Sequence, residues 1–114
     1  MDQAQELATQ ALAQLPAATP TTEPTGRRLL GERANALRLL ARVHLAKALA
    51  TQAIAHAQDA LEIDRSLGRA AHVLASLDLL AEAHERWGDA VQAGQWRERA
   101  ALARQAAARL GRRN

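Results

Sequence analysis

The amino-acid sequence predicts an all-α fold built from stacked helical hairpins. Of the 114 residues, 29 are Ala and 18 are Leu, and there is no Phe, Tyr or Cys. Ala and Leu favour helices, whereas strands use the β-branched and aromatic residues that are scarce here. Apolar residues also recur at spacings of three and four between short breaks, and one block repeats after 40 residues. These observations predict about five helices in one domain.

The N-terminal segment 1–16 predicts a first helix over residues 2–15. Its apolar residues fall on one helical face. They are Leu7, Ala8, Ala11, Leu12 and Leu15. Pro16 ends the helix, because the residue before a proline is pushed out of the helical region. Residues 17–27 are rich in Pro and Thr and are expected to form a linker.

The first helical hairpin is expected over residues 28–66. Its first helix runs from about Arg28 to about Ala46, and its second helix runs to about Asp64. The turn between them lies near Lys47–Ala50, although this stretch has neither Gly nor Pro. Thr51 is a candidate cap for the second helix, with a slightly earlier break as the alternative.

The second helical hairpin is expected over residues 67–110, followed by a basic tail over 111–114. Gly88-Asp89 predicts its turn, with the glycine as terminator and the aspartate as the cap of the next helix. That last helix is expected to end near Leu110, with Gly111 closing it.

The two hairpins carry the 40-residue repeat. Leu37–Ala41 aligns with Leu77–Ala81, and His44 aligns with His84. A repeat of one helical hairpin is typical of a solenoid, in which each unit buries its apolar face against its neighbour.

The spacing resembles the tetratricopeptide repeat, in a long form with 40 residues in place of the usual 34. That family places a bulky residue, a leucine, a small residue and an aromatic on the first helix, and then an alanine, an aromatic and an alanine on the second. These positions hold Leu37, Leu40, Ala41, His44, Ala53, Ala57 and Ala60 in one unit, and Leu77, Leu80, Ala81, His84, Ala93, Arg97 and Ala100 in the other. The aromatic positions thus hold His, Ala or Arg, and His44 and His84 are expected to be half-buried fillers between helices.

The resemblance implies a concave groove lined by the first helix of each unit. Groove-facing residues would form a basic wall and an acidic wall. They are Asn35, Arg38 and Arg42 on the basic wall, and Asp78, Glu82 and Glu85 on the acidic wall. A peptide with charges of both signs would suit such a groove, and the basic wall could also hold a carboxylate. The alternative interpretation is that both sets are ordinary solvated helix faces.

The sequence contains no motif for catalysis, for a cofactor or for a metal ion. The histidines lack metal-ligand spacing, the two serines lie outside any nucleophile motif, and the glycines are scattered. Carboxylate pairs such as Glu62 and Asp64 are expected to face solvent. Trp87 and Trp96 are expected to pack between helices, and an exposed one would be an interface anchor. The prediction is therefore a non-catalytic protein-interaction scaffold.

Charge and hydropathy complete the functional expectation. The net charge of +3 is uneven, because residues 97–114 carry six arginines against Glu98. The long repeat form is common in bacterial signalling and transcription regulators, so the alternative is an accessory domain of such a regulator. Phosphate contacts would then come from Arg104, Arg109, Arg112 and Arg113.

With no transmembrane run and no signal peptide, we expect a soluble, cytoplasmic protein that dimerises or exchanges helices through residues 2–15.

Overall fold

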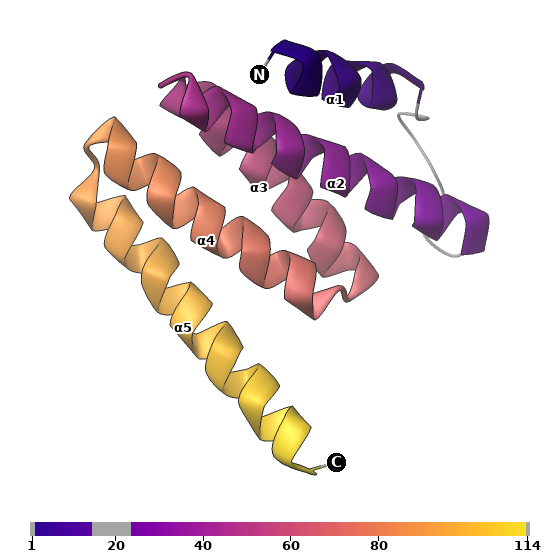
Figure 1. Ribbon diagram of the computed structural model, residues 1–114. Coiled ribbons are helices and arrows are strands. Elements are labelled where there is room, and N and C mark those ends of the chain that lie inside the picture. The colour runs from indigo at the N-terminus through magenta and orange to yellow at the C-terminus, as the bar shows by residue number, and fades with distance from the viewer. Residues whose placement is uncertain (1, 15–23, 114) are drawn as a thin grey trace.

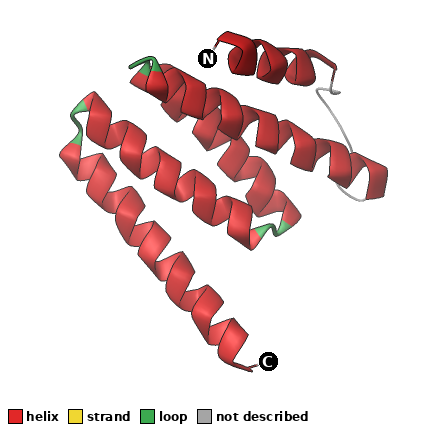
Figure 2. Ribbon diagram, viewed as in Figure 1, coloured by secondary structure: helices red, strands yellow, loops and turns green. Residues whose placement is uncertain are grey.

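The computed structural model describes residues 2–14 and 24–113, which form five α-helices and the short turns between them (Figure 1; Figure 2). The helices are α1 (Asp2–Gln14), α2 (Pro24–Ala46), α3 (Ala50–Leu67), α4 (Ala70–Trp87) and α5 (Ala90–Arg113). Each helix packs against the next one in the sequence, and α2 also contacts α4. The described residues contain no strand, so the all-α prediction is confirmed. None of the described helices is both long enough and apolar enough to cross a membrane.

Small residues hold the helices close together. Ala41, Ala53, Ala57 and Ala83 are fully buried in the main core cluster, which joins α2, α3, α4 and α5. Alanines at a helix crossing let the two backbones approach, and the larger side chains fill the remaining space. These larger side chains are Leu45, Leu61, Leu77, Leu79, Leu80 and Trp96.

The two hairpins, α2–α3 and α4–α5, share one turn geometry at positions 40 residues apart. Ala48 ends the α2 turn with φ +62°, and Gly88 ends α4 with φ +94°. The amide of Leu49 donates to the carbonyl of His44 at 2.8 Å, and the amide of Asp89 donates to the carbonyl of His84 at 2.9 Å. These bonds satisfy carbonyls that a helix end leaves free. The repeat in the sequence is therefore also a repeat in structure.

Ring pairs repeat at the same spacing. His44 on α2 stacks on His56 of α3 with centroids 5.1 Å apart, and His84 on α4 stacks on Trp96 of α5 at 6.4 Å. Both His44 and His84 are half-buried, which confirms the prediction that they fill space between helices. Burial lowers the pKa of His56, and the nearby His44 lowers it further. Trp96 is buried as predicted, but Trp87 is 60% exposed at the end of α4.

The start of α2 corrects the predicted linker. Residues 17–27 were assigned to a connector, yet the helix already begins at Pro24, so residues 24–27 are helical. Proline suits the first turn of a helix, because the fixed φ is helical and the missing N–H has no partner there. The remaining linker residues lie outside the described residues.

The other helix ends also differ from expectation. α3 continues to Leu67 and ends at Gly68 in a left-handed conformation, so the first hairpin is longer than 28–66. Leu49, not Thr51, occupies the cap position of α3 and makes no side-chain capping bond. Asp89 caps α5 as predicted, because its Oδ1 accepts from the Gln92 amide at 3.0 Å. α5 passes through Gly111, so much of the predicted tail is helical.

Candidate partner-binding groove

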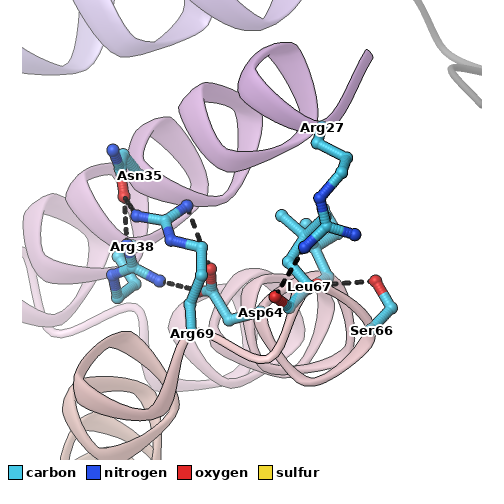
Figure 3. A network of polar contacts seen from close by, with 8 residues as sticks. Arg27, Asn35, Arg38, Asp64, Ser66, Leu67 and Arg69 are labelled. Atoms are coloured by element: carbon cyan, nitrogen blue, oxygen red, sulfur yellow. Dashed lines mark hydrogen bonds and ion pairs between the residues drawn. The ribbon is translucent and has the colours of Figure 1, made fainter. Parts of the chain in front are cut away.

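A buried carboxylate joins three helices at one end of the two hairpins. Asp64, near the end of α3, is 0% exposed and pairs with Arg38 of α2, whose side chain is 5% exposed. Arg69, just before the start of α4, contacts the other oxygen of the same carboxylate, with 3.1 Å between Nη1 and Oδ1 (Figure 3). The Arg69 contact is an ion pair without hydrogen-bond geometry, since Oδ1 accepts no hydrogen bond among the described residues. This network corrects the prediction that Asp64 faces solvent.

Asn35 of α2 completes the network. Its Oδ1 accepts hydrogen bonds from Arg38 and from Nη2 of Arg69, the latter at 3.0 Å. Gly31 lies one turn earlier on α2 and makes room for Arg69, because a Cβ at Gly31 would lie 2.5 Å from Arg69 Nη1. Two arginines thus share one carboxylate, which leaves a surplus positive charge in a partly buried place. Such a charge favours an anion nearby.

Three cavities lie in a row between α2 and α4, next to this network. Their volumes are about 250, 430 and 220 Å³ in order along α2. The first and second share Asn35 and the second and third share Arg42, so the three cavities adjoin one another, and together they are called here the α2–α4 groove. Its lining residues are Arg27, Arg28, Gly31, Glu32, Asn35 and Arg69 in the first part, Asn35, Arg38, Arg42, Ala71, His72 and Ala75 in the second, and Arg42, Leu45, Ala46, Leu79, Glu82 and Arg86 in the third.

The α2–α4 groove is basic. Six arginines line it against two glutamates, and one of those, Glu82, is already paired with Arg86 at 2.9 Å. Arg42 lies at the centre of the groove and is exposed. Within the described residues its guanidinium makes no ion pair or hydrogen bond. Burial lowers the pKa of His72, and Arg69 and Arg38 lower it further, so the groove's charge comes from its arginines.

The structure brings together four of the six predicted groove residues. Asn35, Arg38, Arg42 and Glu82 line the α2–α4 groove. Arg38, however, is only 4% exposed and is held by Asp64, so it belongs to the floor of the groove.

The other two predicted groove residues are not on an acidic wall. Asp78 pairs with Arg104 and Glu85 pairs with Arg97, and both arginines belong to α5. Neither residue lines the α2–α4 groove, because both lie beside α5, which helix periodicity alone could not show. The consequence is a groove with mainly positive charge, in which Glu32 and Glu82 are the acidic lining residues.

Arg69, Gly31 and Asp64 were missed as contributors to the site. The isolated glycine inside a helical pattern was the one usable signal, since such a glycine often marks a close approach. Arg69 and Asp64 lie near a helix junction, where only the packing of three helices brings them to Arg38.

The basic end of α5 offers a smaller set of free cations than predicted. Arg104 is engaged by Asp78, whereas Arg109 is exposed on the last turns of α5. The side chains of Arg112 and Arg113 lie outside the described residues. No group of three His, Asp or Glu side chains in residues 2–14 and 24–113 is placed to hold a metal ion.

Comparisons with known proteins found no matching family model, no matching curated protein and no matching solved structure.

Proposed function

We propose that this chain is a non-catalytic protein-interaction module, a tetratricopeptide-like scaffold whose α2–α4 groove binds an acidic segment of a partner protein. The observation that carries the proposal is the arginine surplus of the groove. Arg38 and Arg69 share the single carboxylate of Asp64, and the exposed guanidinium of Arg42 lies beside them without a partner among the described residues. A carboxylate of the partner would neutralise this charge, and Arg can bind it in a bidentate manner.

The dimensions of the groove suggest the size of the bound segment. From Arg27 to Ala46, α2 extends for about 28 Å at the usual helical rise. An extended segment of about eight residues has this length. At the far end, Leu45, Ala46 and Leu79 lie beside Arg42 and Arg86, so an apolar residue of the segment would fit there next to an acidic one.

The test compares two labelled probe peptides of about eight residues. One carries glutamates, and the other carries glutamines at the same positions, so the two differ in charge alone. Fluorescence anisotropy at low and at physiological salt should show binding of the glutamate peptide that weakens with salt, because surface charges are screened. The glutamine peptide should bind weakly at both.

Arg42→Glu is the decisive variant. Arg42 is exposed and unpaired within the described residues, so reversing its charge should leave the fold intact and weaken glutamate-peptide binding by about tenfold or more. Arg109→Glu is the matched control, since it reverses an exposed charge on α5 and should bind like the unmodified protein. Equal binding by the Arg42→Glu variant would exclude the groove as the binding surface.

The second candidate, nucleic-acid contact through the basic end of α5, has a separate readout. Binding of generic duplex DNA at low salt, lost in Arg109→Glu and retained in Arg42→Glu, would favour it, because phosphate contacts are strongest at low salt. Absence of DNA binding at low salt would leave the groove as the better-supported function.

A further inference from the structure

The two hairpins place equivalent residues on two faces with different surroundings. The face of α2–α3 that meets α4 is covered, whereas none of the described residues covers the corresponding face of α4–α5, called here the outer face (Figure 1). Positions that differ by 40 in number correspond to each other. The covered face therefore shows which residues suit burial at each position, and the outer face shows what replaces them.

Apolar residues fill the covered face. Leu45 is 5% exposed, Ala57 is 0% and Leu61 is 3%, and all three belong to the core cluster that includes α4. Ile54 packs against the same cluster. These four residues lie in or against the cluster that joins the first hairpin to the second.

The outer face has smaller or charged residues at the four equivalent positions. Glu85 stands in place of Leu45, Gly94 in place of Ile54, Arg97 in place of Ala57 and Ala101 in place of Leu61. All four replacements are exposed. Glu85 and Arg97 pair with each other across α4 and α5, and the space around Gly94 is open, because a Cβ there would meet nothing within 4 Å.

A second comparison leads to the same result. Arg38 and Asp64 on the covered face correspond to Asp78 and Arg104 on the outer face, so the ion pair is present at both places with its charges exchanged. The covered pair is 5% and 0% exposed, and the outer pair is 53% and 47% exposed. An ion pair that stays in water avoids the desolvation cost that a buried pair must offset.

We propose that the outer face of α4–α5 is built to repel stacking, and that Glu85, Gly94, Arg97 and Ala101 keep a second copy of this chain from docking there. A docking helix would have to desolvate the Glu85–Arg97 pair and would gain little apolar contact from Gly94 and Ala101. This inference does not depend on what the α2–α4 groove binds.

The test converts the outer face into a copy of the covered face. The variant Glu85→Leu, Gly94→Ile, Arg97→Ala and Ala101→Leu introduces the residues found 40 positions earlier. Sedimentation velocity over about a hundredfold range of concentration should show this variant forming larger assemblies than the unmodified protein, because mass action favours assembly at high concentration. The double variant Glu85→Arg and Arg97→Glu keeps the charges in exchanged order and should sediment like the unmodified protein.

Two measurements keep the test decisive. Circular dichroism should show equal helix content in both variants, so that association is not a result of unfolding. The chain has no cysteine, so Ala101→Cys adds a single exposed thiol on the outer face. This thiol should react with a thiol reagent at the same rate at every protein concentration. Protection of this thiol at high concentration, or unchanged sedimentation of the four-residue variant with its helix content intact, would overturn the proposal.

Discussion

At the scale of single residues, Asp64 contributes to both the fold and the candidate site. Its carboxylate is fully buried and lies between Arg38 and Arg69, which come from two different helices. A buried charge is tolerated only when it is paired. If one member of the pair is removed, the desolvation cost of the remaining buried charge is no longer offset, and the folded state is destabilised. Asp64 therefore fixes how α2, α3 and α4 meet, and it sets the position of two arginines beside the α2–α4 groove.

The charge of Asp64 can be removed without changing its shape. Asp64→Asn should lower the free energy of unfolding by about 3–5 kcal/mol, because Arg38 remains buried without a counter-charge. The matched control is Asp78→Asn, at the equivalent position of the exposed pair, which should cost about 1 kcal/mol or less. Urea denaturation of both variants checks the difference. Equal losses would mean that burial does not distinguish the two pairs.

At the scale of helices and turns, periodicity predicted the number and order of the helices. The residue types at the helix ends did not predict where each helix begins and ends. The α2–α3 turn has no glycine, so its location near Lys47–Ala50 followed only from the need to reverse the chain. Ala48 adopts the left-handed conformation there at φ +62°. Gly111, by contrast, does not end α5. A glycine destabilises a helix by only about 1 kcal/mol relative to alanine, so a single glycine does not terminate the helix. Neither outcome can be read from residue type alone.

Ala48 offers a test of this strain. A left-handed conformation costs a residue with a Cβ roughly 1–2 kcal/mol, and glycine avoids that cost. Ala48→Gly should therefore stabilise the protein by about 1 kcal/mol, which raises Tm by about 4 °C for a domain of this size. Gly88→Ala, at the equivalent turn, should destabilise it by a similar amount. Thermal denaturation followed by circular dichroism would measure both, and a destabilised Ala48→Gly variant would contradict the strain argument.

At the scale of the whole molecule, the sequence predicted the repeat but not how the charged residues divide between two surfaces. Helical spacing correctly placed Asn35, Arg38 and Arg42 on one side of α2. Whether a charged residue on α4 faces α2 or α5 depends on how the hairpins cross, which spacing within one helix does not encode. Asp78 and Glu85 turned out to pair with α5, and this left the groove with mainly positive charge.

The attachment of α1 is also a property of the whole molecule. Among the described helices α1 packs mainly on α2, and Leu12 packs against the cluster that includes Ala34 and Leu37 of α2 and Ala60 of α3. Ala8 is 2% exposed at this contact, and Leu7 is 58% exposed on the other side of α1. A helix of 13 residues is marginal in isolation, so α1 depends on docking, either on its own chain or on a second copy.

We predict that copies of this chain dimerise or exchange helices through residues 2–15. The Ala8→Arg variant should release α1, because an arginine cannot be buried at that contact without a partner. The expected result is loss of the dimer, together with loss of helix signal from at most the 13 residues of α1. Leu7→Arg, on the exposed side of the same helix, is the control and should keep the dimer. Light scattering after size-exclusion chromatography checks both variants, and an unmodified protein that stays monomeric at every concentration would show that α1 does not exchange.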